Sequence, residues 1–122
     1  MDNKDWLEYK IKIRERLRLF SLSIIDLSSK LEGNTASRVI NYQITKSGTS
    51  VYANYRAALR ARSKNEFFSK LSICVEEADE TEMWLDLLIA SNLLKTHKVE
   101  LVYNESLELI KILASMRKKL NK

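Results

Sequence analysis

The N-terminal quarter of the chain carries the pattern that most constrains its fold. Apolar residues there recur at alternating spacings of four and three positions: Ile13, Leu17, Phe20, Ile24, Leu27 and Leu31. An α-helix completes a turn every 3.6 residues, so this spacing places all of them on one side of a helix. Five more apolar residues extend and widen the stripe: Trp6, Leu7, Ile11, Leu22 and Ile25. We therefore predict an amphipathic helix over residues 3–31 that packs in a bundle.

The rest of the chain is also poor in residues that interrupt helices. Its 122 residues include no proline and only two glycines, Gly33 and Gly48. A sheet protein of this length would need many more turn residues. Apolar residues make up 45% and charged residues 30%, which fits amphipathic helices and argues against disorder. We predict a single all-α domain spanning residues 1–122.

The apolar spacing predicts three more helices, over residues 35–62, 64–94 and 98–119. Gly33 is expected to end the first helix, and Asn34 or Thr35 to cap the second. Ser63 and Glu66 have the spacing of a capping box at the start of the third. Because the connections are short, consecutive helices should be antiparallel neighbours. The expected architecture is an antiparallel up-and-down four-helix bundle.

The second helix departs from the leucine-rich pattern of the others. Its predicted inward residues are mostly small or polar: Ala36, Ile40, Gln43, Ser47, Val51, Asn54, Ala58 and Ala61. Small residues let a neighbouring helix approach closely. Gly48 costs ~1 kcal/mol relative to alanine inside a helix, so we expect a kink, a very close contact or a short break there.

Polar residues on this face need hydrogen-bond partners if they are buried. We predict that Asn54, Glu77 and Thr81 are hydrogen-bonded across the contact between the second and third helices. We also predict that Arg56 or Arg60 meets acidic residues of the third helix. These residues are interpreted as structural, together with Gly48, Ser63 and Glu66.

The net charge of +5 is unevenly distributed along the chain. Residues 33–63 contain five basic and no acidic residues, whereas residues 64–95 have a net charge of −4. One interpretation pairs these two segments, within a subunit or between subunits. The other leaves exposed basic ridges as a nucleic-acid footprint, which a pI near 9.4 permits. The residues predicted to contact nucleic acid are Lys10, Arg14, Arg18, Arg117, Lys118 and Lys119.

Residue patterns for catalysis or cofactor binding are missing. His97 is the only histidine and falls in a predicted loop, and Cys74 lies in an apolar run typical of an inert core thiol. The acids near Glu77 lack the Glu-x-x-His pairs of di-iron bundles, and the segment around Gly48 lacks the second glycine and the lysine of a P-loop. We predict no enzyme activity, no metal and no cofactor.

Three tyrosines leave a further alternative open. Tyr42, Tyr52 and Tyr55 could stack on nucleic-acid bases beside Arg56 and Arg60, or they could be interface or core-edge residues. No apolar run reaches the ~18 residues that cross a bilayer, and the N-terminus lacks an apolar signal core. The single cysteine suits a reducing compartment. We expect a cytoplasmic protein that does not enter a membrane.

Two segments carry a resemblance to a known family. The first contains Arg38, Gln43, Ser47 to Val51, Ala53 to Ala58 and Ala61 to Ser63. The second contains Glu66, Phe67, Lys70, Leu71, Ile73, Glu76 to Ala78, Glu80, Thr81, Trp84 and Leu85. Together they resemble the four-helix-bundle proteins encoded by intervening sequences of bacterial 23S rRNA genes. The resemblance is strongest over residues 38–88, and Tyr52 departs from the small residue often found there.

This resemblance implies a bundle that assembles into a ring-like homo-oligomer, a pentamer, with no established enzyme activity. It also implies a relationship to the accessory variability determinants of diversity-generating retroelements, which are basic bundles that bind nucleic acid and a reverse transcriptase. The leading hypothesis is a non-catalytic homo-oligomer that binds RNA or DNA through its basic ridges. The alternative is an oligomeric adaptor that binds a protein partner and no nucleic acid.

Overall fold

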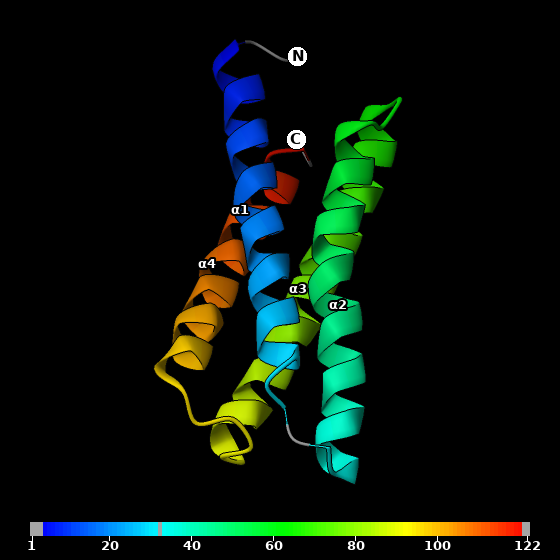
Figure 1. The fold of residues 1–122 in the computed structure, drawn as a ribbon. Coiled ribbons are helices and arrows are strands. Elements are labelled where there is room, and N and C mark those ends of the chain that lie inside the picture. Colours follow the sequence, from blue (N-terminus) through cyan, green and yellow to red (C-terminus); the bar gives the residue numbers. More distant parts are fainter. Residues whose placement is uncertain (1–3, 32, 121–122) are drawn as a thin grey trace.

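A computed structural model describes residues 4–31 and 33–120, which form four helices in an antiparallel up-and-down bundle (Figure 1). The helices are α1 (Lys4–Ser28), α2 (Thr35–Leu59), α3 (Lys64–Ala90) and α4 (His97–Leu120). Consecutive helices pack against each other, while α1 and α4 touch less extensively. The start of α1 and the end of α4 lie at the same end of the bundle as the turn between α2 and α3. The predicted fold class is confirmed; the predicted start at residue 3 lies outside the described residues.

The end of α1 differs from the prediction. The helix ends at Ser28 rather than at residue 31, and Gly33 does not adopt the left-handed conformation of a glycine stop. The Ser28 carbonyl accepts from the Leu31 backbone at 3.3 Å and also from the side-chain amide of Asn41 in α2 at 3.2 Å. Asn34 is the N-cap of α2, as predicted, and its side chain accepts from the Ser37 backbone at 2.9 Å.

The boundaries of the other helices shift by one to four residues. The capping box is present in a shifted form. The Ser63 hydroxyl accepts from the Glu66 backbone at 3.0 Å, and the Glu66 carboxylate accepts from the Arg62 backbone at 3.0 Å, one residue before the N-cap. Whereas α3 was predicted to reach residue 94, it ends at Ala90, because Asn92 adopts a left-handed conformation with φ of 59°. Asparagine tolerates this conformation, and a helix cannot continue through it. In addition, α2 ends at Leu59 rather than residue 62, and α4 begins one residue early.

The core is built from the apolar stripes of all four helices. The main stripe of α1 is buried as predicted, from Ile13 through Leu27. The prediction that four further residues widen this buried stripe is wrong, because they remain 42–49% exposed: Leu7, Ile11, Leu22 and Ile25. The reason is that α1 has neighbours on two sides only, α2 and α4, and these cover a narrower face than a fully enclosed helix would bury.

Close contact between α1 and α2 is centred on Gly48. A Cβ atom at this position would lie 2.8 Å from Cγ2 of Ile24, closer than side-chain atoms tolerate. The Ser21 hydroxyl donates to the Gly48 carbonyl at 2.7 Å, and α2 continues without a break. Of the three outcomes expected for Gly48, the structure has the very close contact. Further along the same contact, the buried Tyr55 hydroxyl donates to the Lys10 carbonyl at 2.8 Å.

Polar atoms also join α2 to α3, although not as predicted throughout. The hydroxyls of Thr81 and Ser47 are hydrogen-bonded at 2.9 Å, which confirms the cross-helix bond expected for Thr81. The prediction for Asn54 is wrong, because its amide donates at 2.9 Å to Ser50 in its own helix. The buried side chain of this turn of α2 is Tyr55, and the neighbouring Asn54 is only half-buried. No hydrogen bond joins the Glu77 carboxylate to α2 among the described residues, and partial burial raises its pKa.

Candidate nucleic-acid interface

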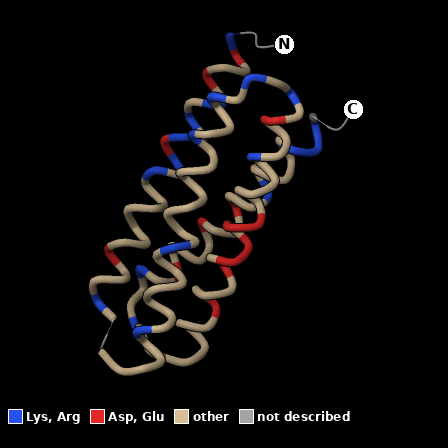
Figure 2. Tube along the Cα trace, turned by 90° about the vertical axis from the view of Figure 1, so that its right-hand side faces the viewer, with Lys and Arg blue, Asp and Glu red and all other residues tan. Residues whose placement is uncertain are grey.

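Positive charge is concentrated in the half of the bundle nearest to both termini. We call this half the basic end and define it by residues 4–18, 51–75 and 104–119. It contains 15 lysines and arginines and 6 acidic residues, a net charge of +9, whereas the remaining described residues contain 5 basic and 8 acidic residues. Figure 2 shows the acidic run of α3 further from the termini. The antiparallel topology therefore gathers basic residues that are far apart in the sequence.

The three predicted contacts in α1 lie in different environments. Lys10 is buried at 8% exposure, and its ammonium lies 5.5 Å from the ring centroids of Trp6 and Phe67. The cation is stabilised by these aromatic faces, so its placement on an exposed ridge is wrong. Arg14 is half-buried, and Arg18 is exposed with an ion pair to Glu15 at 3.3 Å. The two arginines of this group are more exposed than Lys10.

The three predicted contacts in α4 lie in its last turn, where basic residues complement the partial negative charge of a helix C-terminus. Lys118 and Lys119 are exposed, and Arg117 is half-buried. Arg117 and Lys118 line a shallow depression of about 330 Å³ next to Phe68 of α3. These residues share the basic end with Arg14 and Arg18.

A larger groove runs between the outer sides of α1 and α2 at the basic end. Its volume is about 640 Å³. Six of its lining residues define what we call the α1–α2 groove: Leu7, Ile11, Arg14, Tyr52, Arg56 and Arg60. The same groove also borders Lys10 and Arg18. Arg56 and Arg60 were predicted to be structural, with base stacking beside Tyr52 as the alternative. Their position across a groove from Arg14 was not predicted, although an acid-free segment was a signal for it.

The predicted pairing of these two arginines with α3 is wrong within one chain, and pairing between subunits stays a prediction. Within residues 4–31 and 33–120, no ion pair joins Arg56 or Arg60 to a carboxylate. The guanidinium of Arg56 instead lies 5.6 Å from the centroid of the Tyr52 ring, in cation–π contact. Both arginines lie on the exposed side of α2, away from the acids of α3.

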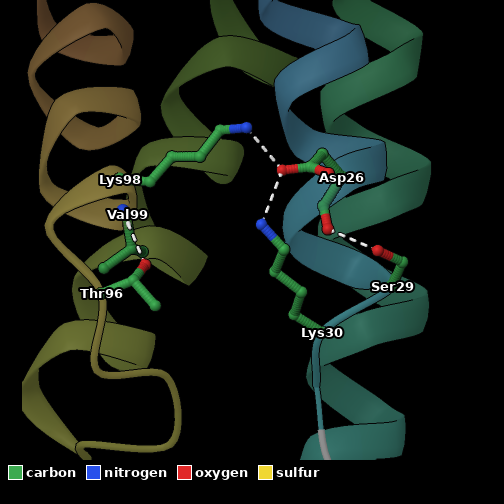
Figure 3. Close-up of polar contacts among 6 residues, drawn as sticks. All are labelled: Asp26, Ser29, Lys30, Thr96, Lys98 and Val99. Carbon is green, nitrogen blue, oxygen red and sulfur yellow. Dashed lines mark hydrogen bonds and ion pairs between the residues drawn. The ribbon is translucent and has the colours of Figure 1, made fainter.

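Ion pairs are found instead between α1 and α4, which the sequence did not indicate. Arg16 donates twice to Glu105, at 2.6 and 3.1 Å, and this contact raises the pKa of the guanidinium. Near the opposite end, Lys98 of α4 and Lys30, two residues after the end of α1, both donate to Asp26, at 2.5 and 3.2 Å (Figure 3). These lysines lower the pKa of Asp26, Lys98 having the larger effect. Neither pair occupies the α1–α2 groove.

The three tyrosines separate into three environments. Tyr55 is fully buried, and burial raises the pKa of its hydroxyl. Tyr42 is 65% exposed, but it lies on the half of α2 away from the basic end. Tyr52 is half-buried and lines the groove. Of the three, only Tyr52 combines access with neighbouring arginines.

The remaining reactive groups lie away from this surface. Cys74 is buried, its thiol donates to the Val51 carbonyl at 3.6 Å, and burial raises its pKa to about 12. A thiol with this pKa stays protonated at neutral pH. His97 is exposed at the start of α4. In the described part of the chain, no three His, Cys, Asp or Glu side chains gather as metal ligands, and no helix has the length and apolarity to span a membrane.

These features place the chain among the small antiparallel four-helix bundles, with a close helix contact at Gly48 and one basic end. The chain matches the family described as 23S rRNA-intervening sequence protein over residues 9–115, and it belongs to that family. It is also similar to a crystal structure of a protein of unknown function from the S23 ribosomal protein family of Bacteroides thetaiotaomicron VPI-5482. The two share 36% sequence identity with a TM-score of 0.81, over 89% of this chain and 97% of the other. No curated protein matches the chain.

Proposed function

We propose that this protein is a non-catalytic, cytoplasmic nucleic-acid-binding protein that contacts phosphates through its basic end. The observation that carries the proposal is the concentration of charge, +9 in one half of the bundle, contributed by all four helices. Lysines and arginines that neutralise phosphates release condensed counterions, which supplies most of the affinity of non-specific binding. The name of the matched family refers to where its genes lie and does not select between RNA and DNA as the ligand.

The test is a binding titration of a labelled RNA at several salt concentrations. Affinity should be measurable at ~50 mM salt and should fall steeply as salt is added. Changing Arg14 and Lys118 together to glutamine should weaken binding and reduce the logarithmic salt slope by about 1–2. The matched control changes Lys46 and Lys95, two exposed lysines outside the basic end, and should have little effect. Undetectable binding, or equal effects of the two double variants, would disprove the proposal.

Exposed apolar side chains support a second candidate function, an oligomeric adaptor that binds protein. Leu22 and Ile25 of α1 are 47% and 49% exposed, and Val39 of α2 is 53% exposed. Leu22 and Ile25 lie one turn apart on α1, and adjoining exposed apolar side chains often mark surfaces that contact another protein. We propose that they contact further copies of the chain in a homo-oligomer, which is compatible with either function.

Light scattering distinguishes these cases. A mass several times that of the 14.2 kDa chain supports the oligomer, and Leu22→Ser with Ile25→Ser should lower that mass. The adaptor function alone would be favoured by an oligomer that shows no affinity for nucleic acid. A monomer at all concentrations would exclude the oligomeric form of both functions.

A further inference from the structure

We propose that the α1–α2 groove holds an unpaired base of a single-stranded nucleic acid, with its phosphates bound by the arginines at the rim. This inference rests on the proposed function, because it assumes that the anionic partner is a nucleic acid. It goes further by naming the strand form that is recognised and the surface that recognises it. Three features of the groove lead to it: its charge, its exposed apolar side chains and its aromatic layer.

The charge of the groove selects an anionic occupant. Arg14, Arg56 and Arg60 have no carboxylate within ion-pairing distance among the described residues. Glu15 is the one acidic residue in the lining, and it is paired with Arg18. Guanidinium groups bind phosphate oxygens through paired N–H donors. The rim therefore has unused donors suited to a phosphodiester chain.

Two exposed apolar side chains interrupt the charged lining on the α1 side of the groove, which phosphates alone do not explain. Leu7 and Ile11, one helical turn apart on α1, are 48% and 42% exposed. A duplex keeps its bases stacked inside and presents phosphates and sugars, which gain little from contact with leucine or isoleucine. An unpaired base has two apolar faces that would cover these side chains. The combination of basic rim and exposed apolar side chains therefore favours a single strand over a duplex.

The opposite wall supplies a layer on which a base can stack. Tyr52 and Arg56 are one turn apart on α2, with the guanidinium held over the tyrosine ring. Proteins stack unpaired bases on tyrosine rings and on guanidinium planes. The groove volume of about 640 Å³ falls within the ~300–1,000 Å³ of sites that bind small molecules. The groove is thus suited to one nucleotide of a longer strand.

The experiment compares probes that carry the same number of phosphates by fluorescence anisotropy at ~50 mM salt. The probes are an oligouridylate of about 12 nucleotides, its oligothymidylate counterpart, the same strand with abasic residues, and a self-complementary hairpin with the same total number of nucleotides. The strand with bases should bind at least about fivefold more tightly than the abasic strand. The RNA and DNA probes show which sugar is preferred.

Variants of the groove then show whether the preference for the strand with bases depends on these side chains. Tyr52→Ala should remove most of the preference for the strand with bases over the abasic strand. Leu7→Ser should reduce the same preference, and because Leu7 is exposed, this variant should fold normally even if Tyr52→Ala does not. Leu101→Ser is the matched control, since Leu101 is 54% exposed on α4, outside the groove. It should leave the preference unchanged.

The possible results separate this inference from the proposed function. Equal affinity for the abasic strand and the strand with bases, or tighter binding of the hairpin, overturns the base site and leaves phosphate binding intact. If both Tyr52→Ala and Leu7→Ser keep the preference for the strand with bases over the abasic strand, the base binds outside the groove. This result also overturns the inference. Absence of binding to every probe overturns both proposals.

Discussion

Two regions of the bundle are held together in different ways: the contacts of α2 with α1 and α3, and the contact between α1 and α4, which we call the α1–α4 edge. Against α1 and α3, α2 uses small residues and buried hydrogen bonds, with Gly48 against Ile24 and Ser47 bonded to Thr81. Between α1 and α4, the polar links are ion pairs of partly exposed side chains, Arg16 with Glu105 and Lys98 with Asp26.

The difference shows which part of the bundle has a fixed geometry. Packing between atoms in direct contact does not depend on salt, and it fails when a side chain is enlarged. Exposed ion pairs contribute little and are screened by salt. The position of α2 relative to its neighbours should therefore be sensitive to sterics, and the α1–α4 edge to ionic strength and pH.

The largest effect is expected at Gly48. Gly48→Val should destabilise the fold by about 3 kcal/mol, because its side chain would overlap the branched Ile24. Chemical denaturation measures the change. The matched control is Ala53→Val, at an exposed position in the same helix, which should have a small effect.

A double-mutant cycle with Ile24→Ala tests the mechanism. If the two side chains clash, the double variant should be more stable than the sum of the single changes predicts. Strict additivity would show that the cost of Gly48→Val has another origin.

A smaller effect is expected at the α1–α4 edge. Arg16→Gln should lower stability by roughly 0.2–1 kcal/mol, and the difference from the wild type should shrink in ~1 M salt. Denaturation curves at low and high salt measure this, with Lys12→Gln on the exposed side of α1 as the control. A loss that is the same at both salt concentrations would contradict an electrostatic origin.

The smallest effect is expected at Asp26 and depends on pH. Its pKa is lowered in the folded state, so ionised Asp26 stabilises the fold above its ordinary pKa. This stabilisation is lost as pH falls through the lowered, folded-state pKa. Asp26→Asn should therefore be less stable than the wild type near neutral pH, and the two should converge in acid. Thermal melting across this range measures the difference, and a gap that widens in acid would refute the assignment.

Local signals made much of the fold predictable. The stripe ending at Leu27, the Asn34 cap and the capping box of Ser63 each depend on residues close in the sequence, and all three are present. The errors concern helix ends and side-chain contacts that depend on residues far away in the sequence. The end of α1 depends on Asn41 of α2, and the burial of Tyr55 displaced Asn54 from the contact with α3.

The candidate interface was predictable only in part, for a related reason. The sequence indicates that Arg14 and Arg18 are basic and one turn apart, but not that Arg56 and Arg60 lie across a groove from them. That arrangement follows from the antiparallel pairing of α1 and α2 and from the close contact at Gly48. Lys10 was misplaced because its aromatic neighbour Phe67 comes from another helix.

The uneven charge of the two halves gives the molecule a large electric dipole along the bundle axis. In the field of a polyanion, such a molecule experiences a torque before any contact forms, and this torque turns the positive half toward the partner. Productive encounters then become a larger share of all collisions, which raises the association rate at low ionic strength. The distribution of charge thus acts on the orientation in which the protein arrives as well as on how tightly it is held.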